Sequence, residues 1–204
     1  NYTLLKRVNI FVHCLNMTKK KNMKKLEHVI VSSKSFDDEE VYAIIGSNIT
    51  VINLILEEGG NYDQMSAEAL QSYFVDYYAA QLNNGNFSQF VYNSRWNRTL
   101  NKLVAKGLKN MGATKQLEYF EAQSKFVEGM SEDELSMYFD SQYFAENATR
   151  ESLNNSNYFQ NYEEENLVNL NAQWLRQLPN LKVLSIEDMY KEIESLLGKN
   201  ISRD

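Results

Sequence analysis

The feature that most constrains this chain is a helical pattern that proline almost never interrupts. The 204 residues include one proline, Pro179, and apolar residues recur at the 3.6-residue period of an α-helix through most of the chain. Serine followed three residues later by an acid predicts helix starts at Ser131 and Ser185, and glycine predicts helix ends at Gly129 and Gly198. We therefore expect an all-α fold: an irregular multi-helix single domain with eight or more helices.

The expected helices span residues 37–58, 66–82, 87–93, 97–110, 114–128, 131–139, 158–178 and 186–197. A capping box of Ser35 and Asp38 is expected to open the first. In the helix at 158–178, the expected buried stripe is Leu167, Leu170, Trp174 and Leu178. Residues 181–185, LKVLS, are compatible with a lone strand that has no evident partner.

The N-terminal residues differ from the rest. Met17 opens MTKKKNMKKL as a natural start would, so residues 1–16 are interpreted as translated upstream sequence. We expect residues 1–22 to be a disordered or non-native extension and residues 23–204 to form a single all-helical domain. The whole chain carries 21 Lys+Arg and 27 Asp+Glu, and because five bases lie in residues 1–22, the remainder has a net charge of −11. Such a surface repels nucleic acid and anionic membranes and attracts basic partners.

The sequence offers little for catalysis. After His28 there is no histidine or cysteine, which removes Ser-His, Cys-His and histidine–metal chemistry from most of the chain. No glycine-rich phosphate loop is present, and carboxylate pairs arise by chance among 27 acids. We expect no enzyme activity, no metal and no cofactor. One cysteine, Cys14, fits a reducing compartment, so we expect a cytoplasmic protein, and no apolar run approaches the ~20 residues that span a bilayer.

Residues 82–93, LNNGNFSQFVYN, predict a corner between two helices. Gly85 stands where a helix C-cap needs a left-handed residue, and Asn86 tolerates the same region. Phe87, Phe90 and Val91 have the i, i+3, i+4 spacing of the inward face of the next helix.

This corner resembles a signature of a bacterial all-helical family. The matching residues are Asn84-Gly85, Phe87, Gln89-Phe90 and Asn93, against Asn-Gly-Gly-Phe, x-Gln-aromatic-aromatic, x-Asn, and Asn86 replaces the usual second glycine. The similarity covers roughly residues 35–197, and the family is named after a DNA-mimic protein. The resemblance implies a homodimer that displays carboxylates in place of DNA phosphates and occupies the DNA-binding face of a helix-turn-helix transcription factor.

The charges are segregated. Residues 26–94 hold ten acids and one base, residues 117–175 hold twelve acids and two bases, and residues 95–116 hold six bases and no acid. Acids in first turns, expected at 37–40 and 132–134, are stabilised by the helix dipole, whereas Glu57 and Glu58 lie at a helix C-terminus that opposes them. Consecutive Glu163–Glu165 splay around a helix and cannot all pair. The candidate partner-binding residues are Glu57, Glu58, Asp63, Glu68, Glu163, Glu164 and Glu165.

Three functions remain open at this point. The favoured one is an acidic, dimeric DNA mimic that inhibits a transcription factor and does not itself bind nucleic acid. A toxin-neutralising immunity-type protein has the same requirements, because it also needs only acidic complementarity to a basic partner. A carboxylate-based hydrolase is the third.

Overall fold

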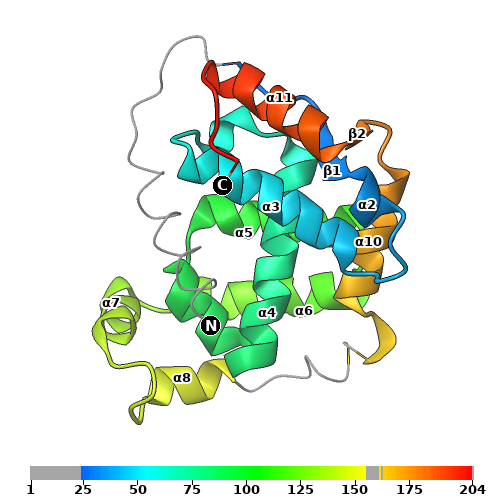
Figure 1. Cartoon of the computed structure of the whole chain (residues 1–204). Helices are drawn as coiled ribbons and strands as arrows, with labels where there is room; N and C mark the ends of the chain where they lie inside the picture. Colours follow the sequence, from blue (N-terminus) through cyan, green and yellow to red (C-terminus); the bar gives the residue numbers. More distant parts are fainter. Residues whose placement is uncertain (1–23, 155–160, 162, 204) are drawn as a thin grey trace. The chain divides into compact units, whose positions relative to one another are not determined.

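The computed structural model describes residues 24–154, 161 and 163–203. The expectation of an extension at residues 1–22 lies outside this range and stays a prediction, as does the single domain from residue 23. Nine α-helices, one short 3₁₀ helix and one two-stranded sheet occur in the described residues (Figure 1), which confirms the predominantly α-helical class. The chain divides into two compact units: unit 1 includes residues 24–73 and 171–203, and unit 2 runs from 74 to 170.

Unit 1 combines short helices with the sheet. Its elements are β1 (Val29–Ser32), α2 (Ser33–Phe36), α3 (Ala43–Glu57), η1 (Tyr62–Gln64), the first turns of α4 (Ala67–Ser94), most of α10 (Leu167–Gln177), β2 (Leu181–Leu184) and α11 (Ile186–Leu197). Its core is aliphatic: Ile44, Ile45 and Ile52 of α3 and Ile193 of α11 are each at most 1% exposed. Burial of these faces excludes apolar area from water and is the main stabilising contribution.

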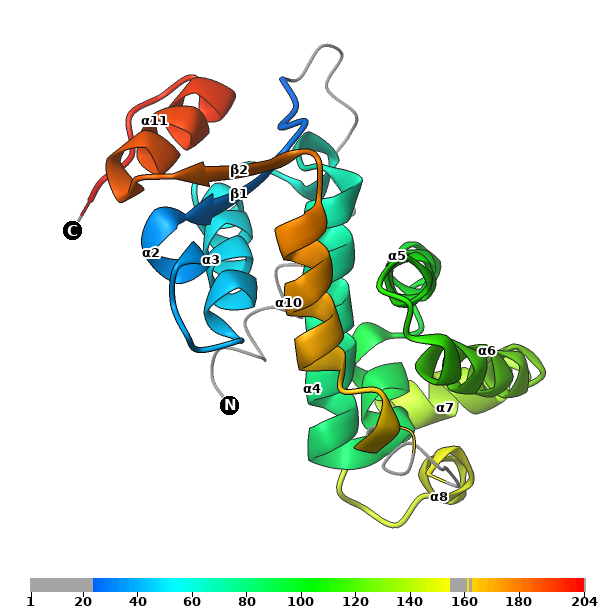
Figure 2. The ribbon, with the colours of Figure 1, turned by 90° about the vertical axis from the view of Figure 1, so that its right-hand side faces the viewer.

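The strand at 181–184 has a partner. It pairs in parallel with β1, Val29 opposite Leu181 and Ser32 opposite Leu184, and the two strands lie between α3 and α11 (Figure 2). The expectation of a lone strand was therefore wrong. Because all four residues of β1 are buried, the run VIVS lacks the polar–apolar alternation by which a half-exposed strand is recognised.

The start of α3 also differs from expectation. Ser35 and Asp38 form no capping box: Ser32 caps the one-turn helix α2, and α3 begins only at Ala43, with no side-chain cap. The end agrees with the prediction, because Gly59 adopts a φ of +83° directly after the helix. Residues 37–40 are therefore not a helical first turn.

All the regular secondary structure in the described residues of unit 2 is helical. It contains the rest of α4, then α5 (Arg98–Asn110), α6 (Thr114–Glu128), α7 (Glu132–Asp140), α8 (Ala148–Leu153) and the beginning of α10. Its core is aromatic. The ring of Tyr78 meets Phe90 edge-on at 5.1 Å and Phe120 at 5.4 Å, and Phe87 packs beside them. Edge-to-face pairs of this kind stabilise beyond their buried area.

The locally capped helices were predicted correctly. The capping box of Ser131 and Glu134 opens α7, where the hydrogen bond from the Ser131 backbone N–H lowers the pKa of Glu134. Ser185 caps α11, and Gly198 closes it in the left-handed conformation. Helix α8 was not anticipated in the polar connection after α7.

The expected stripe of the following helix was partly wrong, and residues 158–160 and 162 of that prediction lie outside the described range. Helix α10 begins at Leu167 and buries Asn171, Ala172 and Leu175, whereas Leu170, Trp174 and Leu178 are only half-buried. The Asn171 amide donates to the Ser72 carbonyl at 3.1 Å, so a polar residue occupies the buried face. The spacing of apolar residues in the sequence cannot predict that a polar residue such as Asn171 lies on the buried face of the helix.

Candidate functional site

Two of the candidate acids lie at the end of α3, in unit 1. Glu57 is the last helical residue and is exposed. Glu58 is the C-cap, and its carboxylate accepts a hydrogen bond from the Lys199 ammonium at 2.6 Å. The dipole of α3 opposes both charges, but of the two glutamates only Glu58 has a compensating cation among the residues that the structure describes.

Two more candidates lie just after this turn. Asp63 is exposed in η1, where its backbone N–H donates to Asn61. Glu68 lies in the first turn of α4, a position that favours a carboxylate, and it accepts from the Asn180 amide at 3.4 Å. Glu68 therefore stabilises its own helix, whereas the Asp63 carboxylate has no such partner in the described part of the chain.

The run Glu163–Glu165 lies in unit 2, and the structure assigns its members different roles. The Glu165 carboxylate accepts hydrogen bonds from the backbone N–H groups of Lys115 and Gln116, both at 3.0 Å. Helix α6 has no side-chain cap from its own N-cap residue, Ala113, so Glu165 caps it from a distant part of the sequence. Glu164 forms an ion pair with the Lys115 ammonium.

The expectation that these three acids cannot all pair agrees with the structure, because Glu164 and Glu165 have partners and Glu163 has none among the described residues. Glu163 is exposed and, like Glu57 and Asp63, has no hydrogen bond or ion pair through its carboxylate among the described residues. We call Glu57, Asp63 and Glu163 the unpaired acids. The first two lie in unit 1 and the third in unit 2, whereas Glu58, Glu68, Glu164 and Glu165 have partners within the fold.

A fourth group of acids, at residues 37–40, was predicted to stabilise the first turn of a helix. In the structure these acids lie on the surface, outside any helical first turn. Asp37, Asp38, Glu39 and Glu40 are all exposed in the loop before α3, not in a helical first turn. Their backbone is ordered by hydrogen bonds from the Asp37 N–H to the Ser33 carbonyl and from the Ala43 N–H to the Glu40 carbonyl, both at 3.0 Å. One of the carboxylates takes part: that of Asp38 accepts from the Glu40 N–H at 3.0 Å. We call residues 37–40 the acidic loop. Four consecutive acids were visible in the sequence, but the supposed capping box led to the wrong interpretation.

The corner occurs where it was predicted, but with a different backbone. Helix α4 is broken at Gly85 and Asn86, and it is Asn86, not Gly85, that has positive φ, with φ 64° and ψ −168°. Few residues other than glycine populate this region. Gly85 is extended at φ −163°, and its glycine is required by close approach: a Cβ there would meet the Gln89 side chain at 2.2 Å and the Tyr143 hydroxyl at 2.7 Å.

Two amides of the signature share one partner, Gln81, which lies outside the signature. Gln89 and Asn93 both donate to the side-chain oxygen of Gln81, at 3.0 and 2.6 Å. The Tyr143 hydroxyl donates to the Gly85 carbonyl at 3.0 Å, which satisfies a backbone group released by the helix break. Phe87 and Phe90 are fully buried, so the signature residues hold the fold together.

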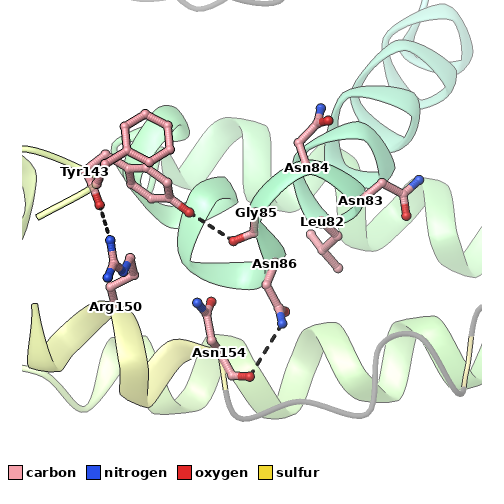
Figure 3. A pocket seen from close by; sticks show the side chains of 9 residues that line it. Leu82, Asn83, Asn84, Gly85, Asn86, Tyr143, Arg150 and Asn154 are labelled. Atoms are coloured by element: carbon pink, nitrogen blue, oxygen red, sulfur yellow. Dashed lines mark hydrogen bonds between the residues drawn. The ribbon is translucent and has the colours of Figure 1, made fainter. Parts of the chain in front are cut away.

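A shallow pocket of about 490 Å³ lies against this corner within unit 2. We call it the corner pocket, and its lining is Leu82, Asn83, Asn84, Gly85, Asn86, Tyr143, Phe144, Arg150 and Asn154. Figure 3 shows Arg150 reaching the Tyr143 backbone, where its guanidinium donates at 2.6 Å, and Asn86 facing Asn154. The lining contains one cation and no carboxylate, unlike most of this chain.

No catalytic arrangement is found in the described residues. They contain no group of three or more His, Cys, Asp or Glu that could hold a metal ion. Burial raises the pKa of the Tyr138 phenol, and its hydroxyl donates to the Ser88 carbonyl at 3.0 Å. It has no base beside it and acts as a core hydrogen-bond donor. No helix in the described ranges combines the length and apolar character that a membrane span needs.

Fold and surface together define an acidic, predominantly α-helical protein. The chain belongs to the DMP19-like protein family, whose model matches residues 63–178, more than half of the 204 residues. This agrees with the corner resemblance, since that family is one of DNA mimics. The matched region includes Asp63, the corner and Glu163–Glu165, and it excludes Glu57, Glu58 and the acidic loop. No curated protein and no solved structure matches the chain.

Proposed function

We propose that this chain is a cytoplasmic DNA mimic that binds the DNA-binding face of a helix-turn-helix transcription factor and blocks its binding to DNA. Membership of the DMP19-like family supports mimicry in general. The observation that carries the proposal for this chain is the set of exposed carboxylates that the fold leaves without internal partners, namely the unpaired acids and most of the acidic loop.

The charge requirement is realistic. Duplex DNA presents one charge per ~1.7 Å of its axis, and a binding protein makes on the order of 6–10 phosphate contacts. Residues 23–204 carry a net charge of −11, enough to populate such a footprint. Dimeric helix-turn-helix proteins bind half-sites roughly 34 Å apart, so a twofold dimer of the mimic would be the natural competitor. A homodimer is therefore part of the proposal.

The partner is first identified by affinity capture. The tagged protein is incubated with lysate of the source cell at moderate salt, and we expect a basic helix-turn-helix protein to be recovered. Recovery of a toxin would instead favour the immunity-type alternative.

The captured regulator is then bound to labelled promoter DNA, and the chain is titrated into the complex while fluorescence anisotropy is recorded.

Displacement of the DNA, with binding that weakens as salt rises, supports the proposal. A ternary complex without displacement contradicts it. The chain is also titrated into free DNA as a control, because α5 presents Arg98, Lys102, Lys106 and Lys109 on its exposed side. We expect no binding at physiological salt, since the acids greatly outnumber these four cations.

A further inference from the structure

The turn before α8 presents an exposed aromatic ring beside the corner pocket. Phe144 is 90% exposed, more than any other large apolar side chain in the described residues. It also lines the corner pocket, so a projecting ring and a hollow lie on the same face of unit 2. An exposed aromatic ring beside a hollow is a candidate for an association site, because large side chains that fill pockets often dominate the binding energy of interfaces.

The turn that carries the Phe144 ring is ordered. The Ala145 N–H closes the turn on the Gln142 carbonyl at 3.0 Å. The Phe144 ring meets Tyr143 edge-on at 5.1 Å, and Tyr143 in turn packs on Tyr92 at 5.2 Å. Because this turn is already ordered, docking of the Phe144 ring would cost little further conformational entropy.

The charges on this face are complementary to one another. Arg150 lines the pocket and has no ion pair with any described carboxylate; its guanidinium donates to a backbone carbonyl and lies over the Tyr143 ring. Glu146, two residues after Phe144, is exposed. The projecting segment thus carries an acid, and the pocket carries a guanidinium suited to bidentate binding of a carboxylate.

We propose that two copies of this chain associate by inserting Phe144 of each copy into the corner pocket of the other, with Glu146 of each copy against Arg150 of the other. An interface about a twofold axis must be self-complementary. A face that carries both a projecting ring and a pocket meets this condition, because the same ring–pocket contact forms twice in the dimer. The absence of carboxylates from the lining matters too, because two strongly acidic chains would otherwise repel each other on contact. This rests on the proposed function in so far as it supplies the dimer of that proposal.

The test is the oligomeric state of the full chain, measured by sedimentation velocity from about 1 to 200 μM. We expect a dimer for the wild type and a dissociation constant raised by at least ~10-fold for Phe144→Ala, since each dimer would lose two buried rings. Met137→Ala is the matched control: Met137 is 73% exposed, lies on α7 and does not line the pocket, so the dimer should persist. Because Phe144 is exposed in a single copy, both variants should still fold and unfold cooperatively, although Phe144→Ala should lose the stabilisation that association gives the wild type.

Charge exchange provides a second arm. Glu146→Arg and Arg150→Glu should each weaken the dimer, and the double variant should recover most of it, provided that all three melt cooperatively. A wild type that is monomeric at 200 μM, or a Phe144→Ala variant that dimerises as wild type, overturns the proposal. If Phe144→Ala loses binding to the transcription factor but dimerises as the wild type does, the proposed interface is also overturned, because the Phe144 ring would then contact the transcription factor and not a second copy of the chain. A Phe144-dependent dimer that fails to displace promoter DNA leaves this interface standing and contradicts only the proposed function.

Discussion

The corner and the run Glu163–Glu165 lie in the same unit and use polar residues in opposite ways. At the corner, neutral amides and a hydroxyl pair with one another or with the backbone, and the aromatic residues beside them are buried. In the acidic run, Glu165 caps α6 and Glu164 pairs with a lysine, while Glu163 remains in solvent. On sequence alone, the corner was predicted to be a structural turn, and the three glutamates were candidate partner-binding residues. The comparison teaches that a run of acids does not by itself mark a partner surface: the candidates that remain are the carboxylates that the fold leaves unpaired.

The corner should give the largest effect on stability. Gly85→Val places side-chain atoms within the space of the Gln89 amide and the Tyr143 hydroxyl, and we expect a loss of about 2–3 kcal/mol in the free energy of unfolding from overpacking and broken hydrogen bonds. Urea denaturation measures it. Gly46→Ala in α3 is the control, because its Cβ would meet only Tyr42 at 3.8 Å, and it should stabilise by about 0.5–1 kcal/mol. Equal stability of the Val variant would mean that the corner is not closely packed.

Asn86 separates strain from hydrogen bonding at the same corner. Its side chain accepts from the Phe87 N–H at 2.7 Å and donates to the Asn154 carbonyl at 3.5 Å, while its backbone is strained. Asn86→Ala loses the bonds and keeps the strain, so we expect a loss of about 1–2 kcal/mol. Asn86→Gly loses the same bonds but relieves strain of order 1–3 kcal/mol, and should lie close to wild type. If alanine were the better-tolerated residue in thermal and urea unfolding, the positive φ at this position would be refuted.

The acidic run should show a smaller and divided effect. Glu165→Ala removes the carboxylate that accepts from two N–H groups of α6, and we expect a loss of about 1 kcal/mol, typical of an N-cap. Glu163→Ala, two residues away and exposed, should change unfolding by less than about 0.5 kcal/mol. The two variants have the same net charge, so a difference between their melting curves reports the cap alone. Identical curves would remove the distinction drawn between these two glutamates.

The features predicted correctly from sequence are those that depend on neighbours in the chain. The caps at Ser131 and Ser185 and the glycine that ends the last helix, Gly198, are set by residues within one turn, so α7 and α11 begin and end close to the expected residues. The buried aromatics after the corner followed from their spacing. Local chemistry of this kind is readable because it needs no knowledge of the tertiary fold.

The errors involve partners far away in sequence. Val29–Ser32 becomes a strand only because residues about 150 positions later lie beside it. Glu165 caps a helix about 50 residues earlier, and Lys199 neutralises Glu58 about 140 residues away. No single-sequence pattern contains these pairings, which is why four of the seven candidate acids proved to have partners in the fold. The acidic loop was missed for the converse reason, since a local capping pattern was present but unused.

The smallest effect on stability, and the most informative one for function, is expected at the unpaired acids of unit 1. Glu57→Gln combined with Asp63→Asn removes two exposed charges without removing an internal contact, and Glu57 opposes the dipole of α3. The free energy of unfolding should be unchanged or slightly higher.

Binding of the same double variant to the captured regulator should weaken by about 3–10-fold at low salt, which corresponds to two partly exposed charge pairs. The difference from wild type should shrink as salt rises, because exposed charges are screened. Glu132→Gln combined with Asp133→Asn is the matched control, since it removes the same net charge from the exposed first turn of α7. Weakening by both variants alike would mean that bulk charge drives association. Retention of wild-type affinity by the first variant at every salt concentration would show that Glu57 and Asp63 are ordinary solvated surface, and would leave the acidic loop and Glu163 as the remaining candidates for the mimic surface.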